Sequence, residues 1–236
     1  MTKQALRERI WDLLEDEGIA RFPFPPHDRI PNFAGAEDAA DRLAETEAWQ
    51  SAEAIKANPD APQLPVRRRA LREGKTVYMA VPRLRDEKPF YELDPAEISA
   101  DEYDSAPTIS HVEEYARQVG PEDVASLGLV VSGSVAVTSA GARVGKGEGY
   151  SDLEYAVLRE LGLVDDETPV STTVHDSQVV EEAVAVEAHD VPMDLVVTPT
   201  ETIRTATEFE RPPGVFWDAL DDERITEIPV LETHQP

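Results

Sequence analysis

The chain lacks cysteine altogether among its 236 residues. Disulfide bonds, thiolate catalysis and zinc sites that use cysteine are therefore excluded. It also lacks any apolar run of about 18 residues, the length that a membrane-spanning helix needs. The first residues, MTKQALRERIWDLLEDEG, are charged and amphipathic and lack the apolar core of a signal peptide. From these absences we expect a cytoplasmic protein without a membrane partner.

Positive charge is scarce, and lysine is the scarcer of the two basic residues. Only 22 basic residues stand against 48 acidic ones, which gives a formal net charge of −26. The lysines are Lys3, Lys56, Lys75, Lys88 and Lys146. Because phosphate backbones bind basic surfaces, this balance argues against a nucleic-acid partner.

Three explanations compete for the acidity: a disordered chain, a basic partner, and adaptation to a cytoplasm that contains molar salt. Apolar and aromatic residues recur throughout the chain, which argues against disorder. The acidic residues are dispersed rather than gathered in a tail, which argues against a dedicated basic partner. At about 1 M salt the Debye length is about 3 Å, so like charges hardly repel one another. We therefore favour a halophilic protein.

The order of the apolar segments predicts a layered fold. Periodicity and end signals predict helices over 2–17, 36–50, 66–73, 109–117 and 151–161. Short apolar or β-branched runs predict strands over 52–57, 76–82, 88–93, 128–137, 170–174, 179–180 and 195–198. Helices that alternate with apolar strands are typical of an α/β domain with a largely parallel sheet.

The length of the chain suits one large domain. We expect a single nucleotide-binding domain over 1–210 and a C-terminal extension over 211–236 that packs on it. The residues of the extension expected to pack are Phe216, Trp217, Leu220 and Ile225. Beyond Leu231 we expect the chain to fray.

The segment Gly141–Asp152, GARVGKGEGYSD, is the most informative stretch of the sequence. It follows an apolar run and opens a predicted helix. Gly145, Gly147 and Gly149 alternate with other residues. Glycines so spaced let the backbone approach an anion closely and turn successive N–H groups towards it.

Charged residues surround these glycines. Arg143 and Lys146 bring positive charge to the same place, and the helix that begins near Ser151 adds its positive end. Asp152 could hold a Mg²⁺ ion that bridges phosphate oxygens. The segment therefore predicts a polyphosphate site. A flexible hairpin with one exposed lysine is the alternative, because the spacing matches neither the P-loop nor the dinucleotide-binding glycine motif.

The run from Arg143 to Asp152, R-x-G-x-G-x-G-Y-x-D, resembles the signature of the 5-formyltetrahydrofolate cyclo-ligases, also called methenyltetrahydrofolate synthetases. Lys3 and Arg7 are similar to the K-x-x-x-R pair in the first helix of that family. Further similarity, in the family's order along the chain, lies in Gly74-Lys75, Pro82-Arg83 and Asp194 before its apolar strand.

The resemblance implies a three-layer αβα domain of the CoA-transferase-like type. It also implies a ligase that uses ATP and Mg²⁺. In that reaction ATP phosphorylates the formyl oxygen of 5-formyltetrahydrofolate and N10 closes on the activated carbon. The product is 5,10-methenyltetrahydrofolate, and ADP and phosphate are released. A related N-formyl metabolite is an alternative substrate, and we expect a monomer or a weak homodimer.

Carried over position by position, the resemblance implies three sets of site residues. The ATP-binding set is Lys3, Arg7, Arg143, Gly145, Lys146, Gly147, Gly149 and Tyr150. The catalytic set is Arg143, Lys146 and Tyr150. The metal-binding set is Asp152 and Asp194. Without the resemblance, Lys3 and Arg7 would be read as solvated charges on a helix face.

Departures from the family pattern concern mostly the substrate side. Ser151 stands where the family has a second tyrosine, Thr138 where it has an aspartate, and Asp60 is only a loose counterpart of its folate-recognising glutamate. The variant loop, the segment NPDAPQ and the tail RPPGVFWD are together similar to the branch called methenyltetrahydrofolate synthase domain-containing. The second hypothesis is therefore a non-catalytic or differently specific ATP- or phosphometabolite-binding protein, linked to thiamine or one-carbon metabolism.

Other residue groups have simpler explanations. The dipeptides His175-Asp176 and His189-Asp190 could bind a metal, but strand ends and surfaces are the commoner place for such pairs. The basic run Arg67–Arg69 could meet an acidic substrate, although a solvated helix face is the simpler interpretation.

Overall fold

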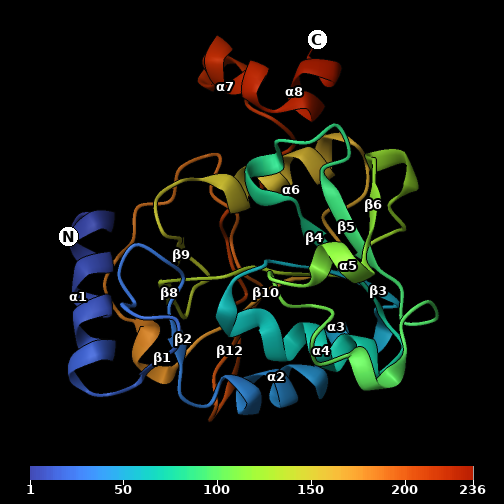
Figure 1. Cartoon of the computed structure of the whole chain (residues 1–236). Coiled ribbons are helices and arrows are strands. Elements are labelled where there is room, and N and C mark those ends of the chain that lie inside the picture. The colour runs from blue at the N-terminus through green and yellow to red at the C-terminus, as the bar shows by residue number, and fades with distance from the viewer. Residues whose placement is uncertain (236) are drawn as a thin grey trace.

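A computed structural model describes residues 1–235 of the protein. An eight-stranded sheet forms its centre (Figure 1). In spatial order its strands are β13 (Thr202–Arg204), β12 (Leu195–Val197), β10 (Val170–Thr173), β7 (Leu129–Val131), β3 (Ala54–Ala57), β4 (Thr76–Ala80), β5 (Phe90–Leu93) and β6 (Arg117–Val119). The strands from β12 to β4 pair in parallel. The pairs at both edges are antiparallel.

Helices cover both faces of this sheet. The helices α2 (Ala36–Ala44), α3 (Glu47–Ser51) and α4 (Leu64–Arg72) lie on one face, and α6 (Tyr150–Glu160) lies on the other (Figure 1). Strand side chains alternate between the two apolar layers, as the period of two requires. Val77 and Leu129 pack with the residues of α2 and α4, whereas Tyr78 and Val130 pack with those of α6. The predicted three-layer α/β class is confirmed.

The N-terminal helix α1 (Lys3–Asp16) covers a smaller sheet beside the main one (Figure 1). This sheet contains β11 (Val179–Val180), β8 (Ala136–Thr138) and β9 (Arg143–Val144). Leu6 and Ile10 of α1 pack against Val135 and Val144. The hydroxyl of Thr2 accepts a hydrogen bond from the amide of Ala5 and so caps the helix as predicted. A two-stranded ribbon of β1 (Ala20–Arg21) and β2 (Asn32–Phe33) follows.

The C-terminal residues lie over α6 as two short helices, α7 (Asp222–Glu227) and α8 (Pro229–His234) (Figure 1). Val215, Ile225 and Leu231 are buried in the same apolar layer as α6. Where fraying was expected beyond Leu231, α8 continues to His234, and Pro236 lies outside the described residues.

The predicted strand 128–137 is wrong as a single element. Its first part is β7 in the large sheet and its last part is β8 in the small sheet. The chain turns away between them at Ser132–Val135, where Gly133 has no room for a side chain because a Cβ there would lie 2.9 Å from Ile30. Burial in two different sheets makes both halves apolar, so periodicity alone could not separate them.

Two predicted helices also differ. The helix 36–50 is broken into α2 and α3, because the hydroxyl of Thr46 caps a new helix by accepting from the amide of Trp49. The helix 109–117 shortens to α5 (Val112–Tyr115), after which the chain becomes the edge strand β6. Within residues 1–235, no helix is both long and apolar enough to cross a membrane.

Candidate functional site

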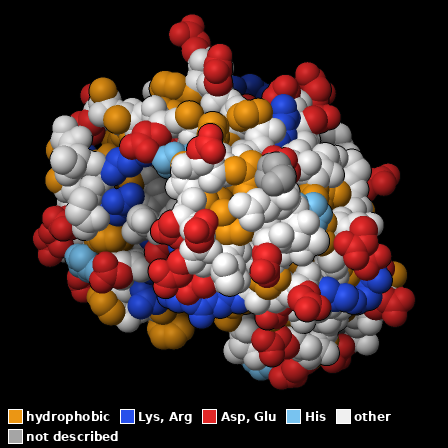
Figure 2. All heavy atoms as spheres, turned by 90° about the horizontal axis from the view of Figure 1, so that it is seen from above, with side chains coloured by type: hydrophobic (Ala, Val, Ile, Leu, Met, Phe, Trp, Pro, Cys, Tyr) orange, Lys and Arg blue, Asp and Glu red, His pale blue; other side chains and the backbone are white. Residues whose placement is uncertain are grey.

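A cavity of about 570 Å³ opens beside the carboxyl ends of β3 and β4. The segment Asn58–Asp60 and the segment Ala80–Arg83, which follow these strands, line one side, and the glycine loop 143–149 lines the other. Ligands of α/β proteins bind at this end of the parallel strands. Figure 2 looks at the molecule from the side of α7 and α8 and shows acidic side chains over much of that face, with lysine and arginine in a few places.

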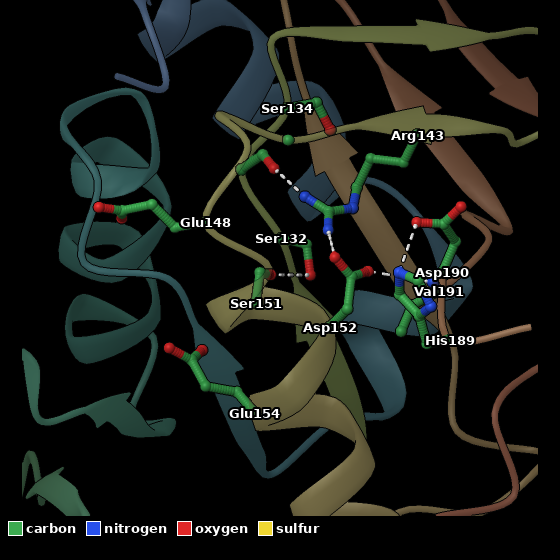
Figure 3. Close-up of polar contacts among 12 residues, drawn as sticks. Ser132, Ser134, Arg143, Glu148, Ser151, Asp152, Glu154, His189, Asp190 and Val191 are labelled. Carbon is green, nitrogen blue, oxygen red and sulfur yellow. Dashed lines mark hydrogen bonds and ion pairs between the residues drawn. The ribbon is translucent and has the colours of Figure 1, made fainter. Parts of the chain in front are cut away.

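The buried guanidinium of Arg143 holds the base of the glycine loop. It donates to the carbonyl of Gly133 at 2.8 Å and to the carboxylate of Asp152 at 2.5 Å (Figure 3). The second oxygen of that carboxylate accepts from the amide of Val191 at 3.1 Å. Arg143 therefore ties β9, the start of α6 and the segment before β12 together.

The other cations beside the loop have different surroundings. The guanidinium of Arg7 donates from Nε to the carbonyl of Gly145 at 2.7 Å, so α1 is bonded directly to the loop. Lys3 pairs with Asp190 at 2.6 Å. Lys146 pairs with Glu148 at 2.7 Å, and this contact lowers the pKa of the Glu148 carboxyl. Lys146 is the most exposed of these three cations and the one available to a ligand.

Glycine is required in the loop for two reasons. Gly147 and Gly149 have φ angles of +113° and +72°, which side chains rarely tolerate. At Gly145 a Cβ would lie 3.0 Å from the guanidinium of Arg143. The spacing of the glycines therefore reflects backbone conformation and the close approach of one arginine.

All but one of the residues predicted for the site line this single cavity. They are Lys3, Arg7, Arg143, Gly145, Lys146, Gly147, Gly149, Tyr150 and Asp152. Their catalytic and binding roles stay predictions.

The exception is Asp194, which was predicted as a metal ligand. It stands at the opposite end of the sheet, immediately before β12, where its carboxylate accepts from the amide of Val170 at 2.7 Å and pairs with Arg211. It does not line the cavity, so it and Asp152 cannot share one ion there. Within residues 1–235 no group of three or more histidine or acidic side chains is arranged to hold a metal.

Sequence reasoning missed a buried polar network below the loop. The ammonium of Lys56, at the end of β3, donates to the amide oxygen of Asn58 at 2.6 Å and to the carboxylate of Glu154 in α6. Asn58 in turn donates to the hydroxyl of Ser151 at 3.1 Å. The side chain of Lys56 is only 1% exposed. The scarcity of lysine was the signal that could have singled it out.

The carboxylate of Asp60 stands out because its oxygens accept no hydrogen bond from any described residue. It lines the cavity, and burial raises the pKa of its carboxyl while the ammonium of Lys146 acts against that rise. A carboxylate in this setting is a ready acceptor for N–H groups of a ligand.

The wall away from the glycine loop is largely apolar. Met79, Val81 and Val112 line it, and the hydroxyl of Tyr91 donates to Glu113 at 3.0 Å. Burial raises the pKa of Tyr91 to about 12, so its hydroxyl stays protonated. The cavity thus has one side formed by the glycine loop with its cations and one side formed mostly by apolar residues.

Residues 1–199 match the model of the 5-formyltetrahydrofolate cyclo-ligase family. The chain belongs to the 5-formyltetrahydrofolate cyclo-ligase family. Its fold is similar to the NMR structure of 5,10-methenyltetrahydrofolate synthetase from Aquifex aeolicus, with a TM-score of 0.54 and 20% identity over 89% of this chain and 96% of that one.

Similar family members include proteins named methenyltetrahydrofolate synthase domain-containing protein. The mouse protein is 44% identical over 232 residues, 98% of this chain and 62% of the mouse protein. The human protein is 38% identical over 234 residues, 99% of this chain and 61% of the human protein. The chain therefore spans about three fifths of the length of these curated relatives.

The buried pair Lys56–Glu154 predicts an asymmetric response to mutation. Lys56→Met or Glu154→Gln alone leaves one buried group without its partner and should lower the free energy of unfolding by about 3–5 kcal/mol. The double variant Lys56→Met/Glu154→Gln should recover part of that loss. Urea unfolding measures all three. The exposed pair Arg9–Glu182 is the control, where Glu182→Gln should cost at most about 1 kcal/mol; additive losses in the double variant would contradict a coupled pair.

Asp60 predicts a pH-dependent gain of stability. The folded protein raises the pKa of this carboxyl above its ordinary value of 3.8. Ionisation of the carboxyl therefore lowers the free energy of unfolding as the pH rises from the ordinary pKa to the raised pKa of the folded state. Asp60→Asn should therefore raise the unfolding free energy at pH 7, and the gain should vanish below the ordinary pKa. Thermal unfolding across pH measures this, with the exposed Asp101→Asn as control. A gain that persists unchanged at the lowest pH would refute the assignment.

Proposed function

We propose that this chain uses ATP to activate 5-formyltetrahydrofolate, or a related N-formyl metabolite. The γ-phosphoryl group passes to the formyl oxygen, the neighbouring nitrogen attacks the activated carbon, and phosphate leaves as the ring closes to the methenyl product. ADP is the second product. The gathering of Arg143, Lys146 and the glycine loop beside one cavity carries this proposal, together with membership of the cyclo-ligase family.

The two halves of the cavity suit the two reactants. The loop amides and the ammonium of Lys146 would bind the phosphates, and Lys146 would stabilise charge on the phosphoryl group in transit. The apolar wall would hold the flat heterocycle, with the carboxylate of Asp60 accepting from its N–H groups. Holding both reactants in one cavity supplies the orientation that phosphoryl transfer depends on.

The cavity offers one of the two predicted carboxylates as a ligand for magnesium. Protein sites usually hold this ion through one or two carboxylates together with substrate phosphates. Asp152 is the predicted metal carboxylate that lies in the cavity, and both its oxygens already accept hydrogen bonds. We therefore propose that the phosphates supply most of the ligands; when bound, the ion would neutralise charge on the phosphate oxygens.

A binding role without catalysis is the second candidate. Glu148 places a carboxylate within the loop, paired with Lys146 and 3.9 Å from Arg83. An incoming phosphate would have to compete with this carboxylate for the two cations. Such a protein would bind a nucleotide or phosphometabolite and act in thiamine or one-carbon metabolism through partners.

An absorbance assay separates the two candidates. Purified protein is mixed with ATP, Mg²⁺ and 5-formyltetrahydrofolate in molar KCl, a medium chosen for the net charge of −26. Appearance of methenyltetrahydrofolate absorbance supports the ligase. A flat trace with a thermal shift on addition of ATP supports the binding role, and no shift at all would refute both.

Lys146→Ala should lower the rate of ATP turnover at least about 100-fold, because the transferring phosphoryl group loses its cation. The melting temperature should change little, since the side chain is partly exposed and pairs only with Glu148. Lys88→Ala, in an exposed loop away from the cavity, is the matched control and should keep the wild-type rate. Turnover by Lys146→Ala at the rate of the control would overturn the assignment.

A further inference from the structure

The C-terminal segment, residues 211–235, is fastened to the domain at its beginning. Arg211 pairs with Asp194 and donates to the carbonyl of Thr168 at 2.9 Å. Asp194, predicted for a metal, thus anchors this segment instead. Further along, the amide of Val215 donates to the carboxylate of Glu160 in α6 at 3.0 Å. The segment is therefore a fixed part of the fold.

The fastened segment places one arginine against the glycine loop. Asp221 caps α7, its carboxylate accepting from the amide of Arg224 at 2.7 Å, while Ile225 on the next position is buried. With α7 oriented in this way, the guanidinium of Arg224 reaches the loop from the side of α6 and donates to the carbonyl of Glu148 at 3.2 Å. The same guanidinium lies 4.1 Å from the ring centroid of Tyr150.

These contacts fall on either side of a glycine of the loop. Gly149, with its positive φ angle, lies between Glu148 and Tyr150. At the other end of the loop, Arg7 donates to the carbonyl of Gly145. A glycine-rich backbone has little intrinsic preference for one conformation. Two arginines from opposite ends of the chain therefore hold the two ends of this loop.

Arg224 acts from outside the ligand cavity. It does not line that cavity but lines a neighbouring one of about 500 Å³, between α6 and the C-terminal segment. It also lies beyond residue 199, where the match to the family model ends. Its effect on a bound ligand must therefore pass through the loop.

We propose that Arg224 is a positioning residue, supplied by the C-terminal segment, that fixes the conformation of the glycine loop for phosphate binding. Its cation–π contact sets the orientation of the Tyr150 ring, and its hydrogen bond fixes the carbonyl of Glu148. The loop then presents its amides to the ligand without first having to become ordered, which strengthens binding. This inference deepens the proposed function and rests on it for the identity of the ligand.

Hydrogen exchange tests the positioning directly and needs no ligand. In Arg224→Ala the amides of residues 145–150 should exchange about tenfold faster than in the wild type. Arg224→Lys keeps a cation over the ring but loses the planar guanidinium group. Its loop amides should exchange at a rate between those of the wild type and Arg224→Ala. Arg204→Ala removes an exposed arginine from the far edge strand β13 and should exchange like the wild type. Unchanged exchange of the loop in Arg224→Ala would overturn the proposal.

Calorimetric titration with ATP then tests the consequence. Arg224→Ala should bind ATP about tenfold more weakly, whereas the KM for the folate should stay within about twofold and the melting temperature should hold. Equal losses for both ligands together with a lower melting temperature would mean a merely structural role. If the wild type itself binds no ATP while its loop still exchanges slowly, the proposed function fails and the positioning role stands.

Discussion

The ion pair between Arg143 and Asp152 is the contact on which the arrangement of the site depends. Its guanidinium is buried, so the charge has to be compensated within the protein. The carboxylate at the start of α6 and the carbonyl of Gly133 supply that compensation. Because Val191 donates to the same carboxylate, three segments distant in sequence converge at one point. The loop between Arg143 and Asp152 then has both ends fixed before any ligand arrives.

Cations and carboxylates line the cavity of this strongly acidic protein together, and most of the cations have a partner within the protein. Lys3 and Arg143 are tied to aspartates, and Arg7 is tied to a backbone carbonyl. Lys146 has its carboxylate partner, Glu148, on the same loop, and both side chains are partly exposed. Local charge at the site is therefore set by which cations have fixed partners, and the formal charge of the whole chain says little about it.

The sequence was sufficient for the layered fold and for most of the predicted residues that line the cavity, for identifiable reasons. Glycines with a required conformation, a helix cap at Thr2 and alternating strands leave local signatures that survive without tertiary information. Asp194 was misplaced because its position before an apolar strand does not say which end of the sheet the carboxylate occupies. Lys56 and Glu154 were missed because they are 98 residues apart and meet only through the fold. Arg224 could not be foreseen either, since its contact with Tyr150 depends on how the last helices lie over α6.

The attachment of α1 has a consequence for the order in which this protein is made. The helix is made before the residues that Arg7 and Lys3 contact, which follow 138 and 187 positions later. The strands of the large sheet lie on both sides of β8 and β9 in the sequence, since β3 to β7 precede this pair and β10, β12 and β13 follow it. A truncated product that stops before Asp190 would therefore lack both the ionic partner of Lys3 and the strands β12 and β13 of the large sheet.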